Sequence, residues 1–240
     1  MTQTARDLLT SGDGKLQLHY FAIEGAAEKV RIALSVAGIP FEDIHVPFPQ
    51  WQTKKPTTKY GQLPEMIFPN GHLITESMAM LRLAGEADPE GKLYPANDVA
   101  TRLKIEEVLG ITSDLTRAWT PALYISMRPE KFGYPKGDAW AKEEKDATVK
   151  KLREEFLEEE LPKYMKFYGD LIKEAGGDAF LIGESLTIAD IAAYQTISYF
   201  RKGIADYIPS NSLEPYEEVL GWMKRFEEHP KVAAYMAAKA

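Results

Sequence analysis

Hydrophobic and polar residues change their spacing near residue 88. Before that point, short runs with alternating apolar positions, typical of strands, are interspersed with stretches at helical spacing. Lys15–Phe21 alternates, residues 26–37 repeat at helical spacing, and Phe41–Val46 is again strand-like. Gly38-Ile39-Pro40 ends the helix, because glycine at a C-cap followed by proline does not continue it. This first stretch therefore predicts a βαβ unit.

The next stretch predicts a loop followed by a second small unit. Pro47–Lys59 contains three prolines and little periodicity, which indicates a loop. Pro64–Phe68 and His72–Ile74 are strand candidates, and the Asn70-Gly71 pair between them is a strong hairpin signal. A helix follows from Thr75 to about Glu86. The predicted order of elements is therefore βαβ, loop, ββα.

After Asp88 the pattern is helical and contains no strand candidate. Apolar positions from Val99 to Ala118 form one long amphipathic stripe. A second stripe begins at Val149 and slips in register near Pro162, where we expect a kink. Two short helices are expected at the end of the chain. We therefore predict a polar N-terminal tail over 1–14, an α/β domain over 15–88, a linker over 89–97 and an all-helical domain over 98–240.

Leu186–Asp190 reads as a helix start with its own cap. The Thr187 side chain can accept a hydrogen bond from the backbone N–H of Asp190, while the Asp190 carboxylate can accept one from the N–H of Thr187. This reciprocal pair is a capping box with aspartate in place of glutamate. Such a cap contributes about 1 kcal/mol to stability.

Composition narrows the classes of function. The 240 residues are 45% apolar and 27% charged, which fits a globular protein of one or two domains. Cysteine is absent, so the chain supplies no disulfide, no cysteine-ligated metal site and no cysteine nucleophile. The net charge of −7 disfavours nucleic-acid and anionic-membrane partners. With neither a membrane-length apolar stretch nor a signal-peptide layout, a cytoplasmic location is expected.

Motifs that act on their own are missing, but three local features are suggestive. The chain has no GxGxxG, P-loop, GxSxG or HExxH, and its scattered histidines predict no metal site. Tyr20 ends a strand just before a helix N-terminus, where its hydroxyl can donate to an anion or simply be satisfied by the backbone. Gly61–Pro64 is either a plain turn or a cis-proline segment that presents the Leu63 backbone. Glu76-Ser77 is a helix cap or an anion site.

Four segments in order resemble one family. LHYFAIEGAAEKVRIALSVAGIPFED, YGQLPEMIFPNGHLITESMAMLR, SLTIADIAAY and HPKVAAYM are similar to the corresponding segments of cytosolic glutathione transferases. The resemblance covers residues 15–240 and is to the tyrosine-type group of sigma, mu, alpha and pi classes, with sigma favoured. It implies an α/β thioredoxin-like N-terminal domain followed by an all-α C-terminal domain.

The resemblance also implies the chemistry. Tyr20, beside Phe21, matches the tyrosine whose O–H donates to the sulfur of glutathione, the cosubstrate. A free thiol with a pKa of about 8.5 is only slightly ionised at neutral pH, so a donor held by the fold favours the reactive thiolate. The thiolate then attacks a hydrophobic electrophile, a reaction associated with detoxification. No metal is implied, and the partners are glutathione and the electrophile.

Further roles are implied residue by residue. Leu63 and the expected cis-proline Pro64 match the segment that pairs with the cysteinyl backbone of glutathione. Glu76 and Ser77, with Gln62, match contacts to the γ-glutamyl end. Trp51 and Lys55 match a pair that reaches the glycyl carboxylate, with Lys54 as a competing candidate. Tyr60 resembles an aromatic key inserted into a partner subunit, which implies a homodimer.

Two parts of the implied site are weaker. Glu24-Gly25-Ala26 stands where family members often have an Arg-Gly-Arg segment, so the arginine that supports the tyrosine is missing. By analogy, the electrophile pocket is lined by Ile23, Leu115 and Trp119, although packing in the core is an equal interpretation for each. Two alternatives to conjugation share the fold. They are a glutathione-dependent isomerase of the prostaglandin-synthase kind and a non-catalytic, crystallin-like binding protein.

Overall fold

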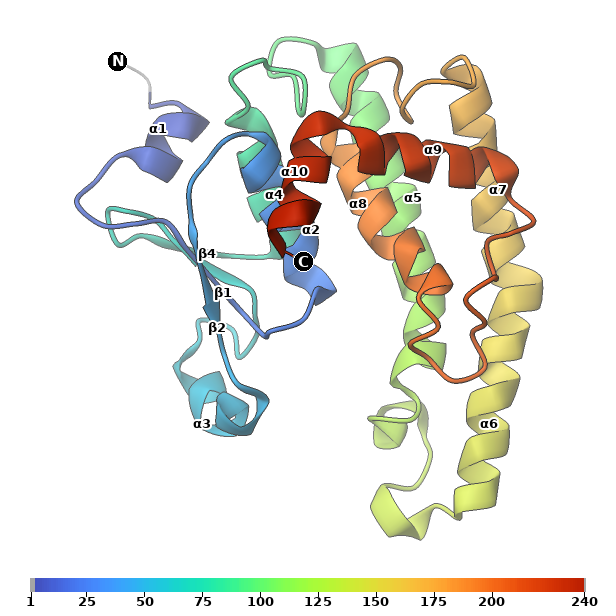
Figure 1. The fold of residues 1–240 in the computed structure, drawn as a ribbon. Coiled ribbons are helices and arrows are strands. Elements are labelled where there is room, and N and C mark those ends of the chain that lie inside the picture. Colours follow the sequence, from blue (N-terminus) through green and yellow to red (C-terminus); the bar gives the residue numbers. More distant parts are fainter. Residues whose placement is uncertain (1–2, 240) are drawn as a thin grey trace. The chain divides into compact units, whose positions relative to one another are not determined.

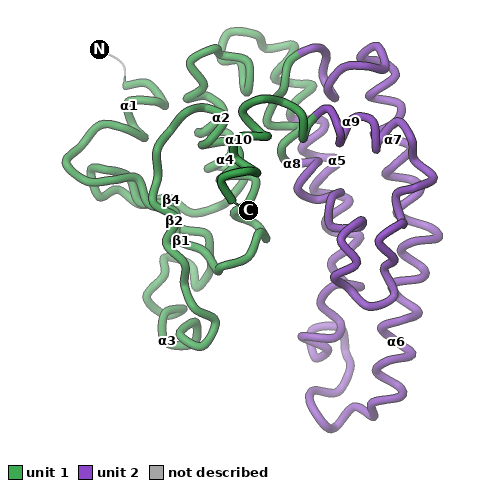
Figure 2. The backbone as a smooth tube through the Cα atoms, in the orientation of Figure 1, with its two compact units in different colours: residues 1–105, 185–191, 226–240 green, residues 106–184, 192–225 purple. Residues whose placement is uncertain are grey.

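A computed structural model describes residues 3–239 of the chain. The chain divides into two compact units, coloured green and purple in Figure 2. The first unit comprises Met1–Ile105, Ser185–Ile191 and Phe226–Ala240, and the second comprises Glu106–Glu184 and Ala192–Arg225. The first contains a sheet with helices, and the second is helical, which confirms the predicted fold class.

The sheet of the first unit has the strand order β2-β1-β3-β4. Its strands are β1 (Gln17–Tyr20), β2 (Glu42–His45), β3 (Glu65–Ile67) and β4 (Leu73–Thr75). β1 runs parallel to β2 and antiparallel to β3, and β3 and β4 form an antiparallel hairpin. The parallel pair requires the crossover helix that the sequence predicted between the first two strands.

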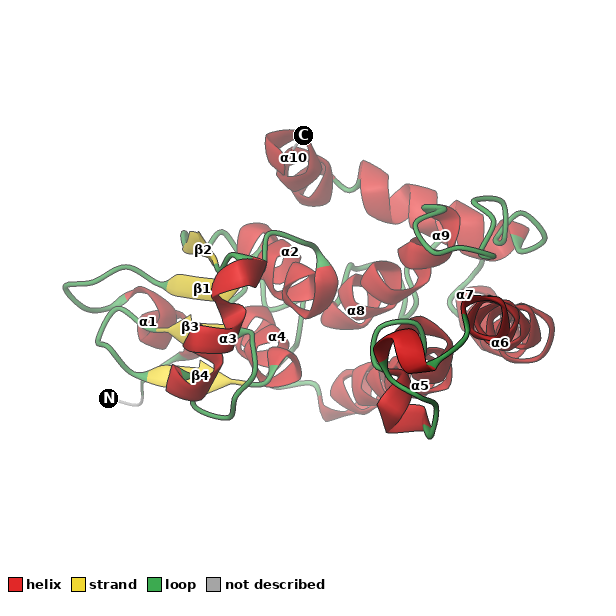
Figure 3. Cartoon of the chain, turned by 90° about the horizontal axis from the view of Figure 1, so that it is seen from below, coloured by secondary structure: helices red, strands yellow, loops and turns green. Residues whose placement is uncertain are grey.

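Helices cover one face of this sheet. α2 (Glu28–Val36) and α4 (Ser77–Glu86) pack against each other and lie on the same side of the strands (Figures 1 and 3). α10 (Pro230–Lys239) packs against α2. The core between sheet and helices is apolar and fully buried, and includes Leu18, Val30, Leu34, Met66, Phe68, Met80 and Leu81. This packing holds the C-terminal end of β1 next to the start of α2.

The first residues are not the polar tail that we predicted. Residues Ala5–Thr10 form the helix α1, which packs against α4. Its start is a capping box in which Thr4 and Asp7 bond each other reciprocally. Leu9 is buried, and the Arg6 guanidinium donates to carbonyls at the C-terminal ends of α2 and α4. One apolar side chain and one arginine are enough to dock this short helix, a signal too small to stand out in a polar segment.

The stretch predicted as a loop after β2 contains short helical turns. Phe48–Gln50 and Lys55–Thr57 are 3₁₀ turns, and α3 (Trp51–Lys54) lies between them. Each 3₁₀ turn has a proline in its first positions, where the missing N–H costs nothing. Turns this short leave no measurable periodicity in the sequence, so they escaped the prediction.

The helical unit is built mainly from long helices. They are α5 (Val99–Tyr124), α6 (Lys142–Glu155), α7 (Leu161–Glu174), α8 (Ile188–Ile197) and α9 (Glu217–Glu228), and α5, α8 and α9 each continue into the first unit. Among residues 3–239, no helix combines the length and the apolar character needed to cross a bilayer.

A π-helical turn explains the register slip in the second apolar stripe. Phe156–Glu160 adopts π geometry between α6 and α7, and Pro162 lies in the first turn of α7. A π turn inserts an extra residue into the helical repeat and so shifts which positions face the core. Pro162 is tolerated because its missing N–H falls at this weakened point of the hydrogen-bond ladder.

The compact units do not follow the predicted boundaries in chain order. Residues beyond 98 belong to the first unit at three places, the start of α5, the start of α8 and α10. The backbone N–H of Ile188 donates to the carbonyl of Leu93 at 2.9 Å, which ties the start of α8 to the linker segment. Such long-range contacts have no local sequence signal.

Candidate active site

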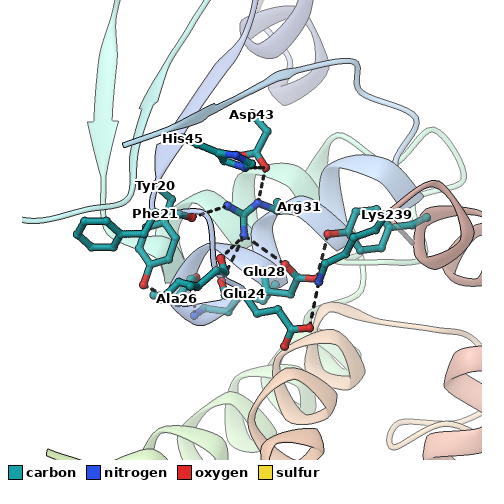
Figure 4. Close-up of polar contacts among 12 residues, drawn as sticks. Tyr20, Phe21, Glu24, Ala26, Glu28, Arg31, Asp43, His45 and Lys239 are labelled. Atoms are coloured by element: carbon teal, nitrogen blue, oxygen red, sulfur yellow. Dashed lines mark hydrogen bonds and ion pairs between the residues drawn. The ribbon is translucent and has the colours of Figure 1, made fainter. Parts of the chain in front are cut away.

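Tyr20 lies at the C-terminal end of β1 and points its ring toward the start of α2. Its phenolic oxygen accepts a hydrogen bond from the backbone N–H of Ala26 at 3.0 Å (Figure 4). Ala26 belongs to the 3₁₀ turn Gly25–Ala27 that leads directly into α2. The phenol is therefore held at a helix N-terminus, where the helix dipole and the donated N–H both favour negative charge on oxygen.

Gly25 allows this close approach. Its φ is +41°, and a Cβ built on it would lie 2.5 Å from the phenolic oxygen of Tyr20. Any other residue would push either the tyrosine or the loop away. The segment 21–26, here called the Tyr20 loop, thus needs glycine at this position for two independent reasons.

Arg31 organises the Tyr20 loop from inside α2. Its guanidinium donates to the backbone carbonyls of Phe21 at 3.4 Å, Ile23 at 2.9 Å and Glu24 at 3.3 Å. The same group lies 5.8 Å from the centroid of the Tyr20 ring. An arginine therefore supports this loop after all, although it does not come from the Glu24–Ala26 segment where the sequence analysis looked for it.

Arg31 is itself fixed by carboxylates. It is buried, and its guanidinium donates to Asp43 at 2.8 Å and to Glu28 at 3.2 Å. A buried guanidinium is tolerated only when its charge is paired and its donors are satisfied. This role of Arg31 was not predicted, because its position in the helical pattern does not indicate these partners. The one local signal is a charged residue within the apolar positions Val30–Leu34.

Lys29 places a second cation on the same loop. Its ammonium donates to the carbonyl of Ala26 at 3.0 Å, and the residue is only 9% exposed. Burial lowers the pKa of Lys29 to about 8. Ala26 thus receives a charged donor on its carbonyl while its N–H contacts Tyr20.

The segment before β3 has the geometry that the resemblance implies. The Leu63–Pro64 peptide bond is cis, and Gly61 has a φ of +65°. Pro64 is buried, Leu63 is half-buried and Gln62 is exposed. The backbone of Leu63 is therefore presented at the end of the sheet, adjacent to the strand that pairs with β1.

Glu76 has an unusual backbone conformation. Its φ is 72° and its ψ is 103°, and only one other non-glycine residue in the described part of the chain, Tyr207, has a positive φ. Such a conformation costs about 1–3 kcal/mol and is concentrated at functional sites. Glu76 is exposed at the N-cap of α4, and Ser77 is the first residue of that helix. The pair therefore combines backbone strain with a helix N-terminus.

Trp51 and the two lysines after it lie around α3. Trp51 makes an edge-on contact with Phe21, with ring centroids 5.4 Å apart, so the Tyr20 loop and α3 are in contact. A Cβ built on Gly61 would lie 3.5 Å from the Cε of Lys55, which places the Lys55 stem beside the segment that precedes β3. Lys54 instead lies near His19, whose pKa is lowered by burial and then by the Lys54 charge. The two lysines therefore have different neighbours, Lys55 beside Gly61 and Lys54 near His19.

The three residues expected to line the electrophile pocket differ in exposure. Ile23 is exposed on the Tyr20 loop, but Leu115 and Trp119 are buried. Trp119 packs against Phe156 and Phe200, with ring centroids 4.8 and 5.4 Å away. The structure therefore places Leu115 and Trp119 in the core of the helical unit, the alternative that the sequence left open, because their apolar positions face inward on α5.

The remaining candidates are the proposed dimer key and the cap of α8. Tyr60 is 61% exposed, as an aromatic side chain available to a partner would be. Asp190 is fully buried and accepts from both the N–H and the hydroxyl of Thr187 at 2.9 Å. The Thr187 hydroxyl oxygen also accepts from the N–H of Ala189 at 3.3 Å. No group of three metal-ligating side chains occurs within residues 3–239.

Comparisons with known proteins agree on one family. Residues 16–83 match the glutathione S-transferase N-terminal domain, and residues 136–239 match the glutathione S-transferase C-terminal domain. A probable glutathione S-transferase 7 of Caenorhabditis elegans is 31% identical over 75% of this chain and 77% of its own length. A glutathione S-transferase P 1 of Xenopus laevis is 27% identical over 93% of this chain and 92% of its own.

Solved structures agree with the sequence comparisons. Prostaglandin synthase D of Nilaparvata lugens is 25% identical to this chain and superposes on it with a TM-score of 0.75. The match includes 94% of this chain and 98% of that protein's chain. A glutathione S-transferase of Caenorhabditis elegans, 23% identical, shares the fold with a TM-score of 0.70 over 94% and 97% of the two chains. The chain belongs to the glutathione S-transferase family.

Proposed function

We propose that this chain conjugates glutathione to hydrophobic electrophiles and that Tyr20 activates the thiol. The single observation that carries the proposal is the hydrogen bond from the Ala26 N–H to the Tyr20 phenolic oxygen at a helix N-terminus. A phenol whose oxygen accepts such a bond is a stronger acid, and its O–H is therefore a stronger donor to a thiolate. Lowering the thiol pKa by two units requires about 2.7 kcal/mol of preferential stabilisation, which one charge-assisted hydrogen bond in a desolvated site can supply.

The reaction is balanced without a redox partner. The glutathione thiol loses its proton to solvent, and the thiolate sulfur forms a bond to an electrophilic carbon. In a substitution, a halide or other leaving group departs with its electron pair; in an addition, the adduct carbon takes up a proton. Tyr20 keeps its own proton throughout and donates it only as a hydrogen bond, so it returns to its starting state after each turnover.

Glutathione is proposed to bind along the edge of the first unit. The Leu63 backbone pairs with the cysteinyl residue in strand-like fashion, and the N-terminus of α4 at Ser77 receives the γ-glutamyl carboxylate. Glu76 and Gln62 contact the γ-glutamyl end. Trp51 and Lys55 contact the glycyl carboxylate, and Phe21 packs beside the reacting sulfur. The electrophile site includes Ile23 on the Tyr20 loop.

The test is the initial rate of conjugation to a chromogenic aryl halide for the wild-type chain and for Tyr20→Phe. We expect the variant to be at least about tenfold slower, with the acid limb of its pH profile moved upward. Retention on immobilised glutathione separates binding from turnover. A variant as fast as the wild type excludes Tyr20 as the activating group, and retention without turnover favours a crystallin-like binding role.

A second candidate is a glutathione-dependent isomerase. The observation in its favour is the similarity to prostaglandin synthase D of Nilaparvata lugens. The same thiolate would attack one oxygen of an endoperoxide, so that an S–O bond forms as the O–O bond breaks and the other oxygen takes up a proton. Loss of a proton from the carbon that bears the first oxygen then forms a carbonyl and expels the thiolate, which regenerates glutathione. Isomerisation of an endoperoxide without net loss of glutathione distinguishes it from conjugation, in which one glutathione is consumed for each product.

The wider context is proposed on the same grounds. A detoxifying role follows from the reaction with hydrophobic electrophiles, and a cytoplasmic location fits the supply of reduced glutathione there. A homodimer with Tyr60 as its key fits the exposure of that ring. A place in the sigma class remains a prediction from the sequence segments around Tyr20 and Trp51.

A further inference from the structure

The last turn of α10 contacts two acidic side chains, Glu24 on the Tyr20 loop and Glu28 at the start of α2. The Lys239 ammonium donates to the Glu24 carboxylate at 3.0 Å and to the Glu28 carboxylate at 2.6 Å (Figure 4). The Tyr235 hydroxyl of the same helix donates to Glu28 at 3.0 Å. Residues more than 200 positions apart in the sequence are thereby joined within one cluster.

Glu28 is the centre of this cluster. Its side chain is buried, and its carboxylate lies between the guanidinium of Arg31 and the ammonium of Lys239. A buried carboxylate is stable when several charged groups donate to it. If one of the cations is removed, part of the negative charge is left without a partner, and the neighbouring side chains must rearrange. Partial burial lowers the pKa of Lys239, but its hydrogen bonds to Glu28 and Glu24 outweigh that effect and raise it overall. Lys239 therefore stays charged at neutral pH.

Two cationic side chains, Arg31 and Lys239, hydrogen-bond to the Tyr20 loop. Arg31 holds its backbone carbonyls, including that of Glu24. Lys239 holds the Glu24 side chain, two residues before the Ala26 N–H that donates to the Tyr20 oxygen. Gly25 lies between these two residues, and a glycine with a positive φ accepts changes of backbone conformation that other residues resist.

We propose that Lys239 is a positioning residue for Tyr20: by holding Glu24 and Glu28, it keeps the Ala26 N–H on the phenolic oxygen and so sets the acidity of that phenol. The proposal rests on the proposed role of Tyr20 in activating the thiol. It also accounts for a departure in the sequence. Position 24 carries a glutamate where similar family members often have the first arginine of an Arg-Gly-Arg segment. Lys239, near the end of the chain, supplies the positive charge that pairs with this glutamate.

The main test measures kcat/KM for conjugation of glutathione to an aryl halide between about pH 6 and 9. Lys239→Met is compared in the wild-type and Tyr20→Phe backgrounds. We expect Lys239→Met to lower kcat/KM about threefold on the acid limb and to move that limb to higher pH, with no further loss in the Tyr20→Phe background. Lys239→Arg keeps the charge and should restore the wild-type profile.

Lys231→Met is the matched control. Lys231 lies on the same helix and pairs with Glu90 at 2.7 Å, an ion pair of the same kind away from the Tyr20 loop. It should leave the pH profile unchanged. A second readout does not depend on turnover: hydrogen exchange of the Ala26 amide should be faster in Lys239→Met than in Lys231→Met, because the loop is released.

The outcomes separate the two proposals. Unchanged Ala26 exchange, or an equal loss of activity in both backgrounds, overturns the positioning role while leaving Tyr20 as the activating group. If Tyr20→Phe itself keeps the wild-type rate and pH profile, the proposed thiol activation by Tyr20 is wrong. The proposed role of Lys239, which depends on it, is then wrong as well. Faster Ala26 exchange together with a loss confined to the Tyr20 background supports the role of Lys239.

Discussion

Gly25 faces the phenolic oxygen of Tyr20 so closely that a methyl group on Gly25 would lie 2.5 Å from it. Gly25→Ala should therefore displace the tyrosine or open the Tyr20 loop. Because a displacement of about 1 Å at a reacting group can cost about a hundredfold in rate, we expect kcat/KM to fall by one to two orders of magnitude. Steady-state kinetics with glutathione and an aryl halide measure this.

Gly38→Ala is the control for the backbone. Gly38 has a φ of +66° and nothing within 4 Å of its hypothetical Cβ. Both substitutions carry the cost of a side chain in the left-handed region, about 1 kcal/mol. Both should therefore lower the melting temperature, but only Gly25→Ala should impair catalysis. Equal activity of the two variants would mean that the loop adjusts without disturbing Tyr20.

The buried capping box at the start of α8 predicts a loss of stability. Asp190 is fully buried and accepts from the N–H and the hydroxyl of Thr187. Asp190→Ala removes the cap and leaves both donors without their acceptor, so we expect the free energy of unfolding to fall by about 2 kcal/mol. Urea denaturation followed by tryptophan fluorescence measures it.

A second capping box in the same chain serves as the comparison. Asp7 and Thr4 form the same reciprocal pair at the start of α1, but on the surface. Asp7→Ala should cost clearly less than Asp190→Ala, because water can replace the lost bonds at an exposed site. Equal losses would show that burial does not set the strength of the cap.

Features with a local signal were predicted well. The strands, the Asn70-Gly71 hairpin and the cap at Asp190 each depend on residues close together in the chain. The roles of Arg31 and Lys239 could not be predicted locally, because their partners come from other elements: Asp43 lies on β2, and Lys239 reaches Glu24 and Glu28 from α10. The helical pattern predicts which positions are apolar, but it does not predict which distant carboxylate will pair with a given cation.

Two short helical segments were not predicted because they are too short to show a repeat. Helix α1 is docked by one leucine and one arginine, and the turns around α3 are each only three or four residues long. Neither provides enough repeats for a period to be recognised. The electrophile pocket stays a prediction, because Leu115 and Trp119 have the same apolar pattern whether they line a pocket or fill a core.

The exposed ring of Tyr60 predicts an effect on assembly. If Tyr60 is inserted into a partner subunit, Tyr60→Ala should raise the dimer dissociation constant by about tenfold or more, as for buried aromatic anchors in other interfaces. Sedimentation at a series of low concentrations measures the constant. Ile204→Ala removes another exposed apolar side chain and should leave it unchanged. Identical profiles for Tyr60→Ala and the wild type would remove the key role.

Lys29 gives stability an unusual dependence on pH. Burial lowers its pKa in the folded chain to about 8, whereas an unfolded lysine has a pKa of about 10.4. Between these values the unfolded chain binds more protons than the folded one, so this group makes stability rise with pH. At pH 7 both states are charged, and the folded state carries the full cost of burying the ammonium.

Lys29→Met should therefore raise the free energy of unfolding at neutral pH by about 1–2 kcal/mol, because the stem stays packed and the buried charge is gone. The gain should shrink as the pH rises through about 8 toward 10, where the wild-type ammonium loses its proton. Urea denaturation of both proteins at each pH measures the difference, in which all other titrating groups cancel. Lys15→Met is the control, since Lys15 is exposed and its pKa is raised by its hydrogen bond to Glu42. A gain for Lys29→Met that does not change with pH would mean that folding does not shift the pKa of Lys29.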